Sequence, residues 1–242
     1  MVITAEDAAK LVREGAGEMP TQWIENDKNE HLRTPGGPDV PPKLKSRLVG
    51  RGDLGHADNR SDSPTAENES IVLVLSFASS RKLVVKCGDI TNVYFQGEKL
   101  TRKWLLRQPK GGLPDESIPE DARLLAQVPI YGTKDAGRGF WKRLRQVLLK
   151  AKLKENFVFT ACYSYCTEAG RVMVMICSHV DDLLWANEPE MEELIELVRR
   201  ELDFGKVEEL SFRYCGREIF QDPQTYEAVS YTHLTLPTTP YV

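Results

Sequence analysis

The chain has 242 residues, of which 41% are hydrophobic and 28% are charged, and this length can bury a sizeable core in one or two domains. The formal net charge of −4 excludes the overall basic character that typifies proteins holding phosphate backbones, so any nucleic-acid surface must be local. No apolar run reaches membrane-spanning length and no charged-then-apolar leader opens the sequence, so we expect an intracellular protein with no membrane partner.

The first eighty residues contain three predicted elements. Thr4 is a good helix N-cap and Gly15 is a good helix stop, which predicts a short helix between them. Residues 47–49 are predicted to form a strand, residues 50–68 a polar loop, and residues 71–77 a buried helix.

Residues 83–97 combine a strand pattern with a carboxylate. The apolar run that begins at Leu83 ends in Asp89, which predicts a buried strand with a carboxylate at its end. Tyr94 follows five residues later. Burial statistics favour a core aromatic at that position, and a contact surface for a nucleotide sugar is the alternative.

Residues 99–154 are locally basic despite the acidic total. They contain fourteen Lys or Arg and five Asp or Glu, with aromatic residues between them at Trp104, Tyr131, Phe140 and Trp141. Cations bind nucleic acid by releasing counterions, and aromatic rings stack on unpaired bases, so this stretch is a candidate template track. The alternative is an ordinary solvated helix face along residues 139–154.

Two apolar runs, residues 171–177 and 183–186, flank residues 179–182 (His-Val-Asp-Asp) and predict a β-hairpin with two carboxylates at its tip. A solvated turn would explain an isolated Asp-Asp pair, because Asp is common in turns. Asp89 at the end of another strand favours a metal site over a solvated turn, because three carboxylates would then meet at one sheet edge. Hard oxygen ligands suit Mg²⁺, and such a set can hold two ions for an in-line phosphoryl displacement.

Beyond the hairpin, residues 188–202 predict an amphipathic helix with an acidic outer side. The five cysteines form no Cys-x-x-Cys pair, so we expect reduced, mostly buried thiols rather than a zinc site. Residues 229–239 fit no predicted element. They resemble the translation of a transposase-based sequencing adapter, so residues 227–242 are set aside from the fold prediction as a non-native tail.

Five segments together resemble the reverse transcriptases of copia-type long-terminal-repeat retrotransposons. Residues 89–97 (Asp-Ile-Thr-Asn-Val-Tyr-Phe-Gln-Gly) are similar to the family's first metal motif, and residues 179–182 are similar to its Tyr-x-Asp-Asp box. Residues 129–144 are similar to the family segment Tyr-Gly-Leu-Lys-Gln-Ala-Pro-Arg-Ala-Trp, and residues 43–49 are similar to Lys-Ala-Arg-Leu-Val. Residues 214–219 are similar to the family hairpin Leu-Gly-Ile-Glu-Ile. Their order and spacing agree over residues 19–226.

The resemblance implies an α+β fold, the palm of a right-hand polymerase, in which an antiparallel sheet packs on helices and fingers are attached. The implied bounds are residues 1–30 for a lead-in helix region, 31–80 for part of the fingers, and 81–226 for the palm with the remaining fingers and a primer-supporting hairpin. The thumb and the RNase H domain would be missing beyond the truncated end, so weak, poorly processive synthesis is expected.

The same resemblance implies an RNA-directed DNA polymerase that uses two Mg²⁺ ions, with Mn²⁺ as the alternative. Asp89, Asp181 and Asp182 are the implied catalytic and metal-binding residues, and Tyr94 would exclude a 2′-hydroxyl under the incoming sugar. The implied partners are an RNA template, a DNA primer, deoxynucleoside triphosphates, and the integrase and RNase H regions of a Pol polyprotein. The implied location is the cytoplasm, in particles of an intact element, or the nucleus.

The matched segments also imply contacts and show departures. The implied substrate-binding residues are Lys45, Arg47, Tyr131, Gly132 and Lys134, and the implied primer-supporting residues are Gly216 and His179. Gly132 marks a position where a nucleotide could approach the backbone closely. His179 replaces the family's Tyr, Asp135 replaces its Gln and Gly137 replaces its Pro. These departures put catalytic efficiency in doubt, whereas all the metal-binding carboxylates are present.

Two rival functions use the same carboxylates. One is a catalytically decayed remnant that binds nucleic acid without turnover. The other is a palm-fold phosphotransferase such as a nucleotide cyclase, which also places carboxylates on a sheet edge but needs no basic track with interleaved aromatics.

Overall fold

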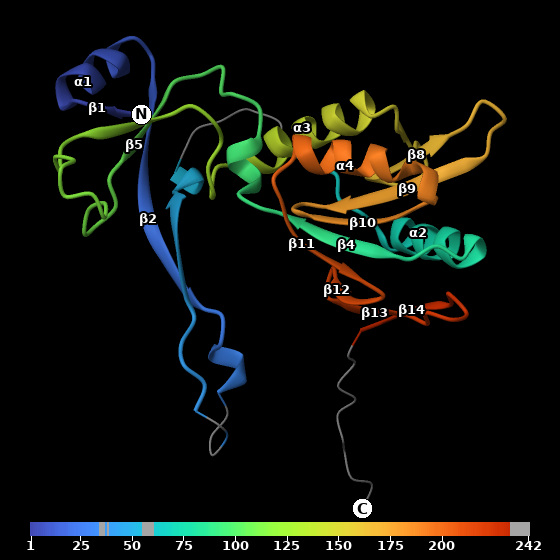
Figure 1. The fold of residues 1–242 in the computed structure, drawn as a ribbon. Coiled ribbons are helices and arrows are strands. Elements are labelled where there is room, and N and C mark those ends of the chain that lie inside the picture. Colours follow the sequence, from blue (N-terminus) through green and yellow to red (C-terminus); the bar gives the residue numbers. More distant parts are fainter. Residues whose placement is uncertain (34–36, 38, 55–60, 233–242) are drawn as a thin grey trace, which may run out of the picture. The chain divides into compact units, whose positions relative to one another are not determined.

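The structure, a computed structural model, describes residues 1–33, 37, 39–54 and 61–232 (Figure 1). The chain forms two compact units. The first holds Met1–Asp62 and Gly97–Phe140, and the second holds Ser63–Gln96 and Trp141–Val242. No helix within the described ranges is long and apolar enough to cross a membrane.

The first unit is built on a five-stranded sheet in the order β1-β6-β5-β2-β3. β2 and β5 are parallel, and the other neighbours are antiparallel. The elements are β1 (Val2–Ile3), α1 (Ala5–Arg13), β2 (Gly17–Asp27), β3 (Leu44–Gly50), β5 (Trp104–Arg107) and β6 (Arg123–Ala126), with 3₁₀ turns at Glu30–Leu32 and Gly52–Leu54. The predicted cap of α1 is confirmed, because the Thr4 hydroxyl oxygen accepts a hydrogen bond from the Asp7 amide at 3.1 Å.

The second unit contains a six-stranded antiparallel sheet, β11-β4-β10-β9-β8-β7, and a three-stranded antiparallel sheet, β12-β13-β14. Its strands are β4 (Lys86–Ile90), β7 (Lys154–Glu155), β8 (Cys162–Cys166), β9 (Val172–His179), β10 (Asp182–Asn187), β11 (Phe204–Glu209), β12 (Ser211–Tyr214), β13 (Arg217–Gln221) and β14 (Ala228–Tyr231). Its helices are α2 (Asn68–Arg81) and α4 (Glu192–Glu201), with 3₁₀ turns at Val93–Gln96 and Pro189–Met191, and α3 (Ala136–Lys150) begins in the first unit and continues into the second.

The core of the second unit lies on both faces of its large sheet. α2 packs on one face, where Val74 and Ala78 are fully buried in a cluster with Cys177 and Leu184. Figure 1 shows α3 and α4 along the other side of the sheet. The strands are therefore covered on both faces, which explains why β9 and β10 read as continuous apolar runs rather than as an alternating pattern.

Most predicted elements of the second unit are present. The buried helix falls within α2, and the hairpin falls on β9 and β10. The predicted amphipathic helix begins as a 3₁₀ turn at Pro189 and becomes α4 at Glu192. All five cysteines are free thiols in the structure, and three are buried and two half-buried, so most are buried as expected.

Residues 228–231, which belong to the segment set aside as a non-native tail, form the strand β14. β14 pairs with β13, with Ile219 opposite Ser230 and Phe220 opposite Val229. β12 covers only one edge of β13, so its other edge can accept any returning strand, and main-chain pairing asks for no particular side chain. Residues 233–242 of the predicted tail lie outside the described residues, and the predicted subdomain bounds stay a prediction.

Candidate active site

β4 and β10 bring two of the predicted carboxylates together. The strands are antiparallel neighbours, and Asp182 lies directly opposite Asp89. Opposed residues in such a pair point to the same face, with Cβ atoms about 4.5–5.5 Å apart. On the other side of β10, Asp182 pairs with His179 of β9, so the three side chains form a row across three strands.

The third carboxylate is at the tip of the hairpin. Val180 and Asp181 form the two-residue connection between β9 and β10. The main-chain oxygen of Asp181 accepts a hydrogen bond from the Ile90 amide at 2.6 Å, which links this tip to the end of β4. Val180 has φ +57°, a left-handed conformation that β-branched residues rarely adopt, and strain of this kind clusters at functional sites.

The charges at this site oppose one another. Partial burial, followed by the charges of Asp181 and Asp89, raises the pKa of Asp182 to about 6. Like charges held together destabilise the ionised form, and a cation would relieve the repulsion. The donors therefore fit a hard divalent ion by chemistry and charge. In the described part of the chain, no three His, Cys, Asp or Glu side chains already converge as a metal cluster.

Gly205 makes room for the carboxylate of Asp89. β11 pairs with β4 through a register shift between Phe204 and Val207, which places Gly205 in an irregular stretch beside Asp89. A Cβ atom on Gly205 would lie 2.6 Å from Asp89 Oδ1 and 3.0 Å from its Cγ, so a side chain here would displace the carboxylate. No sequence pattern marks Gly205 as a site residue, because only the strand register shows its approach to Asp89.

The predicted primer-supporting hairpin lies near the carboxylates. Its two-residue turn, Cys215 and Gly216, has φ values of +50° and +73°, as in a type I′ turn, where glycine is favoured. Burial raises the pKa of the Cys215 thiol to about 11, and the charge of Asp182 adds to this effect. The Tyr214 hydroxyl donates to the main-chain oxygen of Asp182 at 3.5 Å. Gly216 is therefore close to the acidic site.

Tyr94 is half-buried in the 3₁₀ turn Val93–Gln96 that follows β4. It lies in the same unit as the three carboxylates. Its neighbour Phe95 is 50% exposed.

The remaining predicted substrate contacts lie in the first unit. The Arg47 guanidinium lies 5.5 Å from the centre of the Tyr131 ring, while Lys45 on β3 and Lys134 before α3 are exposed. Gly132 has φ +85°, and a Cβ atom there would clash with the main-chain oxygen of Gly50. The structure thus gives a reason for Gly132 that the sequence analysis did not foresee, the close approach of the end of β3.

The family described as "Reverse transcriptase (RNA-dependent DNA polymerase)" matches residues 10–236. This chain belongs to the reverse transcriptase family. A Retrovirus-related Pol polyprotein from transposon RE2 of Arabidopsis thaliana is 30% identical over 147 residues, which cover 59% of this chain and 10% of that protein. The corresponding protein from transposon RE1 is 29% identical over 155 residues, which cover 62% of this chain and 10% of that protein. The chain thus aligns with about a tenth of either relative's length, and the resemblance to copia-type retrotransposon reverse transcriptases is confirmed.

The departures from the reverse transcriptase motifs have structural settings. Asp135 forms an ion pair with Arg102 at 2.5 Å, and the Arg102 guanidinium lies 5.0 Å from the centre of the Trp104 ring. Gly137 lies in the first turn of α3. His179 Nδ1 is buried and has no hydrogen-bond partner among the described residues.

The basic residues of the reverse transcriptase segment 99–154 are largely paired with acids. At least eight of the fourteen form ion pairs, which are Arg102–Asp135, Lys103–Glu14, Arg107–Glu18, Arg123–Glu18, Arg138–Asp62, Arg143–Glu201, Arg145–Glu155 and Lys150–Glu201. Most of these acids are distant in sequence, so the local count could not reveal them. The segment is not a continuous track of uncompensated charge.

The two-stranded ribbon of β2 and β3 has a different charge distribution. The register places Asn26 opposite Lys45 and Ile24 opposite Arg47, and the Lys28 amide donates to the Lys43 carbonyl at 3.0 Å. Opposed and alternate residues share a face, so one face carries all four cations of this stretch, Lys28, Lys43, Lys45 and Arg47. The acids Glu25 and Asp27 belong to the other face. We call the first surface the basic ribbon face.

Proposed function

We propose that this reverse transcriptase-family chain is an RNA-directed DNA polymerase domain, with the second unit as its palm and the first unit as the main part of its fingers. The observation that carries the proposal is Asp182 directly opposite Asp89, with Asp181 beside them at a strained hairpin tip. An edge of three carboxylates on a rigid sheet is suited to a reaction in which charge moves between phosphate oxygens.

The proposed reaction is nucleotidyl transfer. The primer 3′-hydroxyl oxygen attacks the α-phosphorus of a deoxynucleoside triphosphate, the bond to the bridging oxygen breaks, and pyrophosphate leaves. Asp89, Asp181 and Asp182 would hold two Mg²⁺ ions, or Mn²⁺ in their place. When bound, such ions stabilise the negative charge on the attacking and leaving oxygens. The chain's own part is to hold the carboxylates on adjacent strands, with Gly205 leaving space beside Asp89.

The substrates are assigned by the same logic. Tyr94 would lie against the incoming sugar and exclude a 2′-hydroxyl by steric clash. The basic ribbon face would contact phosphates of the RNA template or the nucleotide, through Lys45 and Arg47, and Lys134 would add a further contact. His179 and Gly216, close to Asp182 in the second unit, would support the DNA primer end.

The cellular setting is a separate proposal. Both relatives are named as Pol polyproteins of transposons, so we place this domain in such a polyprotein, with integrase and RNase H regions elsewhere in it. Copying of an RNA element would occur in the cytoplasm, inside particles, with the nucleus as the destination of the DNA.

Primer extension tests the proposed activity directly. The unchanged chain is incubated with an RNA template, a DNA primer, deoxynucleotides and Mg²⁺. We expect Asp89→Asn and Asp181→Asn to slow extension by about a hundredfold or more, because groups that stabilise developing charge contribute on that order. Glu193→Gln, the same change on the exposed side of α4, is the matched control and should extend normally.

Two outcomes would contradict the proposal. Equal extension by the wild type and both Asn variants would mean that the carboxylates take no part. Nucleic-acid binding without any extension by the wild type would instead favour the decayed, binding-only alternative.

A further inference from the structure

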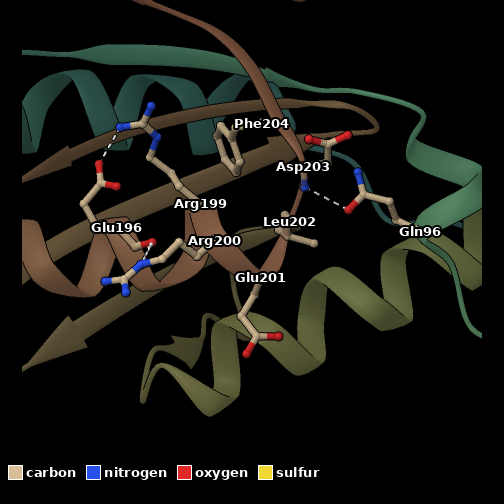
Figure 2. A pocket seen from close by; sticks show the side chains of 8 residues that line it. All are labelled: Gln96, Glu196, Arg199, Arg200, Glu201, Leu202, Asp203 and Phe204. Atoms are coloured by element: carbon tan, nitrogen blue, oxygen red, sulfur yellow. Dashed lines mark hydrogen bonds and ion pairs between the residues drawn. The ribbon is translucent and has the colours of Figure 1, made fainter.

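The side chain of Gln96 joins two segments of the second unit that are far apart in sequence. Its Nε2 donates to the main-chain oxygen of Thr91 at 2.6 Å, and its Oε1 accepts from the Asp203 amide at 2.9 Å. Figure 2 shows the second of these bonds. Both ends of the amide are engaged, and both partners are main-chain groups, so the bonds fix backbone rather than side chains.

Thr91 and Asp203 are also bonded to each other. The Thr91 amide donates to the Asp203 main-chain oxygen at 2.8 Å. The Thr91 hydroxyl lies 2.9 Å from the same oxygen and 2.7 Å from Asp203 Oδ2, so it donates to one or shares its proton between them. The three residues form a closed set of hydrogen bonds, which we call the Thr91–Gln96–Asp203 clamp.

The clamp encloses the turn that carries Tyr94. Thr91 lies two residues after Asp89, and Gln96 lies two residues after Tyr94. Within the turn, Asn92 has φ +48° and its main-chain oxygen accepts from the Phe95 amide at 2.9 Å. The turn is therefore held at both ends, and from the Tyr94 end the Gln96 side chain reaches back to Thr91 and across to Asp203.

The other side of the clamp is anchored in the core. Asp203 follows Leu202, which is 1% exposed, and precedes Phe204, whose ring meets Trp185 edge-on with centroids 6.1 Å apart. The next residue is Gly205, which contacts Asp89. One rigid segment thus holds the Tyr94 turn and also limits the position of the Asp89 carboxylate.

We propose that Gln96 is a positioning residue that sets Tyr94 relative to Asp89 and so contributes to selection of deoxynucleotides over ribonucleotides. This inference rests on the proposed polymerase function and on Tyr94 as the residue against the sugar. Exclusion of a single hydroxyl group by steric clash requires a fixed side chain, because a side chain that moves by about an ångström accepts both sugars. The amide is suited to the task, since it donates at one end and accepts at the other.

Gln96 can be changed without opening the core. It lines a surface pocket of about 480 Å³ with seven residues of α4, the start of β11 and the connection between them, which are Glu196, Arg199, Arg200, Glu201, Leu202, Asp203 and Phe204 (Figure 2). A side chain changed at this position therefore lies beside solvent rather than within the core. Loss of a function in such a variant is then attributable to the lost bonds.

The test compares three variants by sugar discrimination. Gln96→Met keeps the length of the side chain and removes both hydrogen bonds, while Gln96→Glu keeps the acceptor for the Asp203 amide and loses the donor to Thr91. Gln224→Met makes the same change on an exposed turn of the same unit and is the control. Binding of dATP and of ATP is measured on an RNA template whose primer ends in a dideoxynucleotide, so no turnover is needed, and KM and kcat are measured with an ordinary primer.

We expect Gln96→Met to lower the preference for dATP by about tenfold, which is the change that one or two net hydrogen bonds produce. KM for dATP should rise more than kcat falls, Gln96→Glu should lie between Gln96→Met and the wild type, and Gln224→Met should match the wild type. An unchanged preference in Gln96→Met, or an equal loss for both sugars, would overturn the inference.

Hydrogen exchange separates failure of the inference from failure of the proposed function. The Asp203 amide should exchange at least about tenfold faster in Gln96→Met, and unchanged exchange would overturn the clamp itself. A wild type that neither extends primers nor binds dATP would overturn the polymerase proposal and sugar selection together. An active wild type with normal discrimination in Gln96→Met would overturn the inference about Gln96 alone.

Discussion

Gly205 shows how one missing side chain can control a reactive group. The strand next to β4 comes so close to Asp89 that only a hydrogen atom fits at this position. We predict that Gly205→Ala slows primer extension by about a hundredfold, because a displacement of about 1 Å in a reacting geometry costs on that order. Extension kinetics check this, with Glu208→Ala, at an exposed position of the same strand β11, as the control. Equal rates for Gly205→Ala and the wild type would contradict it.

The raised pKa of Asp182 predicts a pH-dependent stability in metal-free buffer. The folded protein holds a proton on Asp182 up to a pH of about 6, whereas the ordinary value is 3.8. The contribution of this carboxyl to stability is therefore fully present below the ordinary value and is lost as pH rises through about 6. Asp182→Asn has no carboxyl to ionise at this position, so its stability does not fall in this pH range for that reason. The Tm of Asp182→Asn minus the Tm of the wild type should therefore be larger at pH 8 than at pH 5.

Thermal unfolding followed by circular dichroism at the two pH values measures this difference. Added Mg²⁺ should reduce it, because a cation stabilises the three ionised carboxylates of the wild type more than the two that remain in Asp182→Asn. A Tm difference that is the same at pH 5 and pH 8 would refute the assignment.

The basic ribbon face gives a prediction for a whole element. Lys43, just before β3, and Lys45 on β3 belong to the same face of the ribbon, about 6–7 Å apart, and both are exposed. Replacing both by Ala should weaken binding of single-stranded RNA and reduce the slope of log K against log salt by about 1.4, since each phosphate contact contributes about 0.7. Fluorescence anisotropy at several salt concentrations measures the slope.

The control variant for that experiment also removes two positive charges from the first unit. Lys10 and Arg13 lie in the last turn of α1, outside β2 and β3. Their double Ala variant should retain the wild-type slope. If both double variants reduce the slope equally, net charge rather than the ribbon face determines binding.

Elements that depend on neighbouring residues could be predicted from the sequence. The cap at Thr4 is a contact across three residues, and the β9–β10 hairpin follows from two apolar runs around a short polar tip. Contacts between distant segments could not. The acids that neutralise residues 99–154, the approach of Gly205 to Asp89 and the bonds of Gln96 all depend on strand register or helix placement. β14 was missed because main-chain pairing leaves little trace in side chains.

At the scale of the whole molecule, each of the two units has core residues of its own. The first unit buries Met19, Trp104, Leu106 and Ile130 together, and the second has the cluster around α2. We predict that Leu106→Ala destabilises the first unit by about 2–5 kcal/mol and lowers hydrogen-exchange protection in β5 and β6 more than in β9 and β10. Leu184→Ala, in the second core, should give the opposite pattern. An equal decrease throughout the chain in both variants would mean that it unfolds as one cooperative body.

The pairing of β4 with β10 also sets when the acidic site can form. Asp89 and Asp182 are separated by more than ninety residues, so their contact requires closure of a long loop, which is a late and slow event in folding. A chain emerging from the ribosome has Asp89 long before its partner strand exists. The repulsion between Asp89 and Asp182 arises only at that last step, and divalent cations should therefore speed the final assembly of the second unit more than its early collapse.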